Sequence, residues 1–389
     1  MAREGHRARY NHRSRRAIRG CRVKILARLI IGLFAVLVLA IGALAVTISY
    51  TEECDGLPTV TSGVELMRAV QYRCYGGPEV LEFVEVPKPQ PGDNQVLVRV
   101  LAAAVNPLDW HYMRGSPYIM RLDSGIGAPK NPGLGVDFAG IVEAVGANVT
   151  KFEPGDEVFG GRNGAFAEYV VIGQDSAIAR MPPNVTFEEA AAVPIAAITA
   201  LQALRDKANV QPGDKVLING ASGGVGTFAV QIAKDMGAEV TGVCSTRNVQ
   251  MVRILGADHV FDYTKENYTT ASVEFDAIID LVGNHPLSAN RRVMADDGIM
   301  VIVGAQKGDW LGPLAAPLKA VFYRPFVSQD FVMLLSQFNQ QDFETLAAYL
   351  EDGTINPQLD RIYPFDAIPE AMRLSESGRA QGKIVIKFD

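Results

Sequence analysis

The chain has 389 residues and a formal net charge of −6, from 37 Lys and Arg against 43 Asp and Glu. About half of the residues are hydrophobic and about a fifth are charged, which excludes a wholly disordered chain. Residues 1–28 hold ten of the basic residues and one acid, so the rest carries a net charge of −15. A body this acidic is not expected to bind nucleic acid. Four cysteines are too few for a disulfide-dense scaffold.

Residues 29–50 are apolar and uncharged. As an α-helix this segment would be roughly 33 Å long, which exceeds the ~30 Å hydrocarbon core of a bilayer. We therefore expect a basic tail (1–28), a transmembrane helix (29–50) and a linker (51–66), with the N-terminus in the cytoplasm beside its arginines. A cleaved signal peptide is the alternative, because Ala43-Leu44-Ala45 offers a cleavage site and Ser14-Arg15-Arg16 resembles a twin-arginine signal.

Residues 67–186 predict a small, twisted, mostly antiparallel β domain. Alternating apolar and polar residues, separated by Gly and Pro turns, favour strands. The strands are expected at 67–72, 81–86, 95–105, 138–145, 157–159 and 167–172.

The pattern changes at residue 187. Residues 187–207 are Ala-rich and predict a helix interrupted by Pro194. Strands then alternate with helices, which predicts an α/β fold with a doubly wound parallel sheet. The strands are expected at 215–219, 239–244, 259–261, 277–280 and 299–303, and the helices at 227–236, 249–255 and 291–294.

A glycine loop joins the first of these strands to its helix. Glycines there permit a tight turn and close approach of a diphosphate, which the helix N-terminus attracts. The strand–loop–helix context makes this incomplete G-x-G-x-x-G pattern informative, although a turn that needs glycine only for packing is the alternative. The predicted cofactor-binding residues of the loop are Ala221, Ser222, Gly223, Gly224, Val225 and Gly226.

The end of the second strand bears on the choice of nicotinamide cofactor. NAD sites usually place Asp or Glu about 20 residues past the glycines. Residues 243–248 contain no carboxylate, whereas Ser245 and Arg247 could bind a 2′-phosphate. The sequence favours NADPH over NADH, with a solvated surface arginine as the alternative.

These motifs resemble the medium-chain dehydrogenase/reductase superfamily, and within it the zinc-independent quinone oxidoreductase branch with its zeta-crystallin-like and reticulon-4-interacting-protein-like members. The resemblance covers residues 67–389 and implies a GroES-like catalytic domain (67–186 and 356–389), a Rossmann NADPH-binding domain (187–355) and a cofactor cleft between them. The matching pieces are residues 105–109, 154–158, 213–217, 222–226 with Gln231 and Lys234, 255–258, 262–263 and 382–386.

The resemblance also argues against a metal. Zinc-dependent relatives carry Cys at the position of Asn106 and Gly-His-Glu at Gly135-Val136-Asp137. A zinc site needs three or four converging N, S or O ligands, so we expect no bound metal. Cys74 and Cys244 are expected to be small core residues.

Without a metal, hydride transfer to a quinone or an α,β-unsaturated carbonyl compound is the expected chemistry. The resemblance places Asn106 beside the nicotinamide ribose and gives Asn106 and Asp109 a role in shaping the site. A turn built by Asn-Pro-x-Asp is the structural alternative. The resemblance to enoyl-thioester reductases, which use a Tyr a few residues after a Gly, implies Tyr118 as the proton donor, although it is offset by one position; Tyr112, His111 and water are the alternatives.

Tyr263, Val282 and Gly304, each at or just past the end of a predicted strand, are expected near the cofactor. The resemblance also implies that Thr199, in the Ala-rich helix, approaches the nicotinamide. Residues 310–338 are apolar and aromatic, which favours helix packing or a dimer surface over a substrate entrance or second membrane contact.

The sequence thus predicts a membrane-anchored, NADPH-dependent, zinc-independent oxidoreductase with a small-molecule substrate, and a homodimer is a further expectation. A non-catalytic NADPH-binding membrane protein is the main alternative, and an alcohol dehydrogenase a lesser one. The side of the membrane that carries the body stays open, because cytoplasmic NADPH and the position of the arginines point to opposite sides.

Overall fold

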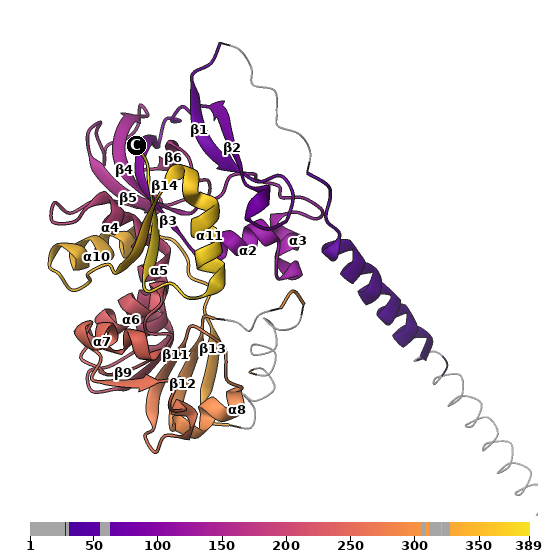
Figure 1. The fold of residues 1–389 in the computed structure, drawn as a ribbon, viewed down its shortest axis with the longest axis vertical. Coiled ribbons are helices and arrows are strands. Elements are labelled where there is room, and N and C mark those ends of the chain that lie inside the picture. The colour runs from indigo at the N-terminus through magenta and orange to yellow at the C-terminus, as the bar shows by residue number, and fades with distance from the viewer. Residues whose placement is uncertain (1–27, 29–30, 55–62, 305–307, 311–319, 321–326) are drawn as a thin grey trace, which may run out of the picture. The chain divides into compact units, whose positions relative to one another are not determined.

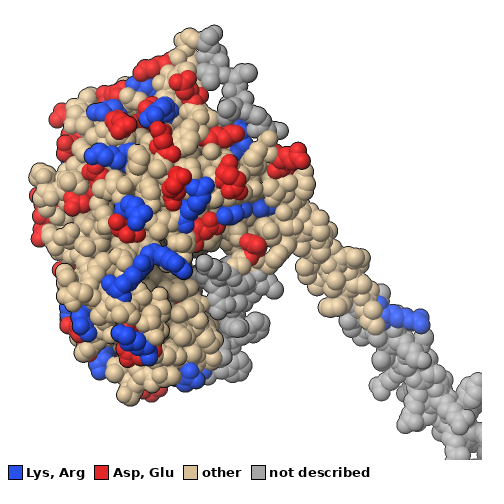
Figure 2. Space-filling view, in the orientation of Figure 1, with Lys and Arg blue, Asp and Glu red and all other residues tan. Residues whose placement is uncertain are grey.

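The computed structural model describes residues 28, 31–54, 63–304, 308–310, 320 and 327–389 (Figure 1). The chain divides into two compact units, residues 1–51 and residues 52–389. In the first unit, Ile31–Ser49 forms a 19-residue helix that is long and apolar enough to cross a membrane. Figure 2 shows this helix without charged side chains, whereas both signs of charge are mixed over the visible face of the second unit.

The first sheet of the second unit has seven strands and is mostly antiparallel, as expected. Its order is β14-β15-β3-β4-β5-β7, with β6 paired to β3. A separate hairpin pairs β1 (Leu66–Gln71) with β2 (Glu82–Pro87). The strands of the sheet are β3 (Gln95–Val105), β4 (Asp137–Val145), β5 (Glu157–Gly161), β6 (Tyr169–Gly173), β7 (Ile178–Arg180), β14 (Leu359–Pro364) and β15 (Lys383–Lys387).

The second sheet has six parallel strands in the order β10-β9-β8-β11-β12-β13, which confirms the doubly wound fold. The order reverses between β8 and β11, and α/β sheets of this kind bind ligands at such a switch point. The strands are β8 (Lys215–Asn219), β9 (Glu239–Cys244), β10 (His259–Asp262), β11 (Phe275–Asp280), β12 (Met294–Ile302) and β13 (Asp330–Met333).

Helices α4 (Phe187–Ala191) and α5 (Pro194–Gln202) form the expected interrupted Ala-rich segment. Pro194 begins α5, where its missing N–H costs nothing. Small side chains allow α5 to be buried along nearly its whole length, packed against α6 (Gly224–Asp235), β4 and β5 (Figure 1). One continuous core therefore joins the two sheets.

One predicted helix is misplaced. A helix was expected at 291–294, but α8 occupies Leu287–Asn290, directly after Pro286. Residues 291–293 form a 3-10 turn, and Met294 already belongs to β12. Among the described residues, four α-helices were not predicted: α2 (Pro107–Arg114), α3 (Arg121–Ser124), α10 (Gln340–Glu351) and α11 (Ile368–Ser377). Helix α7 (Val249–Ile254) lies where it was expected. Residues 311–319 and 321–326 of the apolar stretch at 310–338 lie outside the described residues.

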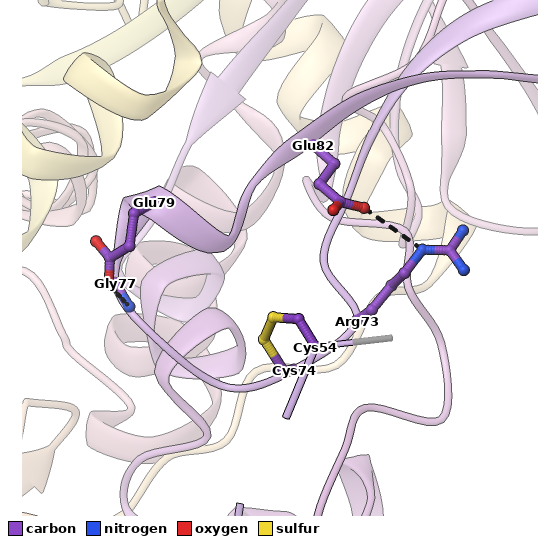
Figure 3. The surroundings of a disulfide bond; sticks show 6 residues. All are labelled: Cys54, Arg73, Cys74, Gly77, Glu79 and Glu82. Carbon is purple, nitrogen blue, oxygen red and sulfur yellow. Dashed lines mark hydrogen bonds and ion pairs between the residues drawn. A yellow bond between two sulfur atoms is a disulfide. The ribbon is translucent and has the colours of Figure 1, made fainter. Parts of the chain in front are cut away.

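The cysteines correct one expectation. Cys74 is buried but is not a free core thiol, because it forms a disulfide with Cys54 across a Cα–Cα separation of 4.9 Å (Figure 3). The disulfide lies near the Arg73–Glu82 ion pair, and it attaches Cys54 to the segment that connects β1 and β2. Cys244 is the buried core residue that was expected.

Candidate active site

The glycine loop lies between β8 and α6. A Cβ on Gly226 would come within 2.2 Å of the Gly220 carbonyl oxygen, so the loop requires glycine there. A Cβ on Gly223 would have only the Gly220 carbonyl oxygen nearby, at 3.5 Å, so a ligand can approach the backbone there. The first N–H groups of α6 have no partner within the helix. An open backbone at a helix N-terminus fits a diphosphate.

The ends of β9 and β10 lie beside this loop. The Tyr263 N–H donates to the Cys244 carbonyl at 3.0 Å, which places the exposed Tyr263 next to Ser245. The Arg247 guanidinium donates to the Arg379 carbonyl at 2.6 Å. Ser245, Arg247 and Tyr263 therefore all lie at the ends of β9 and β10.

Sequence reasoning missed Asn248. Its amide Nδ2 donates to Ser222 Oγ at 2.8 Å, so it ties the glycine loop to the segment after β9. An asparagine in a short polar run after a strand carries no distinctive pattern, and only the fold brings it to Ser222.

The switch point is organised by Asp280 at the end of β11. Its Oδ1 accepts hydrogen bonds from the backbone N–H groups of Val282 and Gly283, at 3.1 and 2.9 Å. The Gly304 N–H donates to the Asp280 carbonyl at 2.9 Å. Val282 and Gly304 thus lie together, and Val282 borders Gly220 of the loop.

A cavity of about 460 Å³ lies at the opposite end of α6 from the glycine loop. Among the described residues its lining includes Lys234, Asp235 and Gln358, and none of the predicted site residues. It is therefore not a candidate for the cofactor cleft.

The second part of the site is the turn that begins α2. The Asn106 backbone N–H donates to Asp109 Oδ2 at 2.7 Å, so Asp109 builds the turn. The Asn106 side chain donates to Asp137 Oδ2 at 2.9 Å and to the Ala104 carbonyl at 3.3 Å. Both carboxyl groups are fully buried. Burial raises the pKa of Asp109 to about 7, and it raises the pKa of Asp137 against the opposing charge of Lys383.

Lys383, at the start of β15, completes this cluster. Its Nζ donates to Asn106 Oδ1 at 2.5 Å and to Asp137 Oδ2 at 3.1 Å, and its side chain is 3% exposed. Sequence analysis gave Lys383 no role. The available signal was a lysine opening an otherwise apolar strand, where a charge has to find a buried partner.

Thr199 lies one turn into α5. Its hydroxyl donates to the Ile195 carbonyl at 2.6 Å and is within 3.1 Å of Ser336 Oγ. The Ile195 N–H donates to Asp137 Oδ1 at 3.0 Å. Helix α5 is therefore fixed to the same carboxylate that holds Asn106, and Thr199 lies one helical turn after Ile195.

Tyr118 belongs to a different set of contacts. Its ring packs at 4.8 Å from Trp310 and at 4.6 Å from the Arg121 guanidinium, and its N–H donates to the Asp309 carbonyl. Tyr112 lies on α2, and burial, followed by the charges of Asp123 and Asp109, raises its pKa. The role of Tyr118 as proton donor stays a prediction.

The donor set around Asn106 does not suit zinc. Val136 offers no ligand atom, and the Asn106 oxygen already accepts from Lys383. Tetrahedral zinc sites need at least three converging protein ligands. Across the described part of the chain, no group of three or more His, Cys, Asp or Glu is arranged to hold a metal ion.

Comparison with known proteins places these features in a family. Residues 92–183 match the alcohol dehydrogenase GroES-like domain, and residues 255–386 match the zinc-binding dehydrogenase family. The chain is 34% identical over 342 residues to a quinone oxidoreductase of Sus scrofa, covering 84% of this chain and 99% of the relative. It is 34% identical over 341 residues to a chloroplast envelope quinone oxidoreductase homolog of Arabidopsis thaliana, covering 83% and 99%.

Solved structures of quinone oxidoreductases have a similar fold. The quinone oxidoreductase from Coxiella burnetii superposes with a TM-score of 0.73 at 31% identity, covering 83% of this chain and 99% of that one. The Escherichia coli quinone oxidoreductase complexed with NADPH gives a TM-score of 0.71 at 25% identity, covering 82% and 99%. The chain therefore belongs to the medium-chain dehydrogenase/reductase superfamily, as an NAD(P)H-dependent oxidoreductase of the quinone oxidoreductase family.

Proposed function

We propose that the protein transfers hydride from NADPH to a quinone or an α,β-unsaturated carbonyl compound without a metal. The observation that carries this proposal is the buried Asn106 turn, which is joined to the glycine loop through the C-terminal strand. The Gly382 N–H donates to the Ser222 carbonyl at 2.9 Å, and the next residue, Lys383, holds Asn106. Two consecutive residues, Gly382 and Lys383, thus contact the expected cofactor loop and the expected reaction site.

Different residues would bind the different parts of the cofactor. The N–H groups at the start of α6 would bind the diphosphate, Ser245 and Arg247 the 2′-phosphate, and Asn106 the nicotinamide ribose. When bound, the reduced nicotinamide supplies the hydride. The protein contributes orientation and a fixed electrostatic environment.

Turnover tests the proposal against its rival. NADPH oxidation is followed by stopped-flow absorbance with a panel of quinones and enones, for the wild type and Asn106→Ala. We expect oxidation with at least one acceptor and a large loss in the variant. NADPH binding without turnover on any acceptor would instead support the non-catalytic binding protein.

The preference for NADPH is supported by the charge at the end of β9. Arg247 is exposed there, and the neighbouring carboxylate of Asp262 is already engaged by Thr246 and Lys265. Arg247→Ala removes one charge-assisted hydrogen bond, worth about 1.5–3 kcal/mol, so we expect NADPH to bind roughly 10- to 150-fold more weakly. NADH affinity should change little.

The matched control is Arg253→Ala, an exposed arginine on the adjacent α7. It should leave both affinities unchanged in the same fluorescence titrations. Tighter binding of NADH than NADPH by the wild type, with no effect of Arg247→Ala, would contradict the assignment of the 2′-phosphate site.

We further propose a single-pass membrane protein with a cytoplasmic N-terminus and the catalytic unit (residues 52–389) on the opposite side, where the enzyme would need NADPH outside the cytoplasm. The basic tail and the helix Ile31–Ser49 support this orientation. The disulfide between Cys54 and Cys74 adds a separate argument, because disulfides persist in oxidising compartments.

Protease treatment of intact cells tests the orientation. The catalytic unit should be cleaved without permeabilisation, and the mature protein should retain residues 1–50 by mass. A protected unit that is cleaved only after permeabilisation would place the enzyme in the cytoplasm. A mature mass lacking the apolar segment would indicate a cleaved signal peptide.

A further inference from the structure

Lys383 lies in a cluster that buries more negative than positive charge. Asp109 on α2 and Asp137 on β4 are both fully buried, and Lys383 on β15 is the cation in contact with Asp137. The charge of Asp109 also contributes, after burial and other charges, to the raised pKa values of Tyr72 and Tyr112. A buried carboxylate without a cation is costly, so this ammonium is needed for Asp137 to remain ionised.

Lys383 also determines how the Asn106 amide is oriented. An ammonium can only donate hydrogen bonds, so the atom of Asn106 that faces Nζ at 2.5 Å must be the oxygen. The amide nitrogen is then directed to Asp137 and to the Ala104 carbonyl. Both ends of the amide are engaged, and rotation of the Asn106 side chain would break three hydrogen bonds.

The stem of Lys383 connects this amide to the glycine loop. A Cβ on Gly224 would lie 3.0 Å from Lys383 Cδ, so the methylene chain runs close to the start of α6. Gly382 is bridged to Gly223 in the same place. On the other side, Ile384 pairs with Val105, the residue before Asn106. One side chain therefore spans from the loop to the turn.

We propose that Lys383 is a positioning residue for hydride transfer: its ammonium fixes the Asn106 amide and holds Asp137 ionised, while its stem keeps this arrangement in register with the glycine loop. This role rests on the proposed function, since Asn106 is the group through which it acts. Its loss should slow the transfer step much more than it weakens NADPH binding.

Lys383→Met tests this role, because methionine keeps an apolar stem beside Gly224 and removes only the charge. We expect the single-turnover rate of NADPH oxidation to fall at least tenfold and the Kd for NADPH to change less than threefold. The acid limb of the pH–rate profile should move up by about one pH unit, because Asp137 loses its cation. Lys383→Arg should restore part of the rate.

The matched control is Lys387→Met, at the other end of β15. Lys387 is exposed and pairs with Glu188, away from Asn106. This variant should leave the rate, the Kd and the pH profile unchanged. Equal rates and pH profiles in Lys383→Met and the wild type would overturn the proposal. So would a uniform loss at every pH that Lys383→Arg does not relieve, because that pattern indicates a purely structural role.

A readout without cofactor separates this proposal from the proposed function. The melting temperature of the Lys383→Met apoprotein should fall more steeply than that of the wild type as pH rises from 5 to 8, because two buried carboxylates then ionise without a cation. The double variant Asp137→Asn with Lys383→Met should recover part of the loss, and it also serves if the single variant does not fold. Parallel melting curves for all three proteins would refute the charge compensation. If none of the quinones and enones supports NADPH oxidation by the wild type, the proposed function fails. The melting series still decides the electrostatic role of Lys383.

Discussion

Two glycines of the nucleotide loop should fail in different ways when changed to alanine. At Gly226 the added Cβ would stand 2.2 Å from the Gly220 oxygen and 2.8 Å from two backbone atoms of Ala221. None of these atoms belongs to a flexible side chain, so the loop itself has to open by about 1 Å. Overpacking of this kind costs roughly 1–3 kcal/mol, and we expect Gly226→Ala to lower the free energy of unfolding by that amount.

At Gly223 the backbone has φ −84° and ψ 176°, which alanine adopts without strain, and the nearest atom to an added Cβ is 3.5 Å away. Gly223→Ala should therefore leave the free energy of unfolding within about 0.5 kcal/mol of the wild type. It should still weaken NADPH at least tenfold, because the methyl group occupies space that the diphosphate needs.

Urea unfolding of the apoprotein and fluorescence titration with NADPH measure the two effects separately. Gly226→Ala should lose both stability and binding, and Gly223→Ala should lose binding alone. Wild-type NADPH affinity in Gly223→Ala would refute the placement of the diphosphate on this loop. Wild-type stability in Gly226→Ala would refute the steric argument.

Three further predictions concern the catalytic unit. Burial raises the pKa of Asp109 from 3.8 to about 7, so the protein should lose about 4 kcal/mol of unfolding free energy as pH rises from below 4 through 7. Urea unfolding between pH 4 and 8 should show this fall, and Asp109→Asn should flatten it. If Tyr118 donates the proton, Tyr118→Phe should slow enone reduction about 100-fold and leave the NADPH affinity unchanged. A wild-type rate in this variant would exclude Tyr118 as the proton donor, and a slower rate in Tyr112→Phe would implicate Tyr112 instead. Cys54→Ser opens a link across 20 residues and should cost about 3 kcal/mol of stability, with the variant, unlike the wild type, insensitive to reductant.

The local parts of the site could be predicted from the sequence. Strands β8 and β9 have the predicted bounds, and the loop between β8 and α6 lies where the glycines indicated, because strand, loop and helix are contiguous and each has its own pattern. The fold class followed from the alternation of such units.

The long-range parts could not be predicted from local patterns. Lys383 meets Asn106 across 277 residues and Asp137 across 246, and nothing near any of the three residues indicates the other two. The pairing of Cys54 with Cys74 likewise depends on how the hairpin folds back, since cysteine spacing alone does not define connectivity. The misplaced helix near Arg291 shows the same limit, because Met294 is drawn into a strand by its pairing with Phe275.

Single-turnover oxidation of NADPH deuterated at the nicotinamide C4 tests whether hydride passes directly to the acceptor. With an enone acceptor, we expect slower oxidation of the deuterated cofactor and deuterium on a carbon of the reduced product, in protein that contains no stoichiometric zinc. Binding of NADPH without oxidation by any quinone or enone, or turnover that requires added zinc, would contradict this expectation.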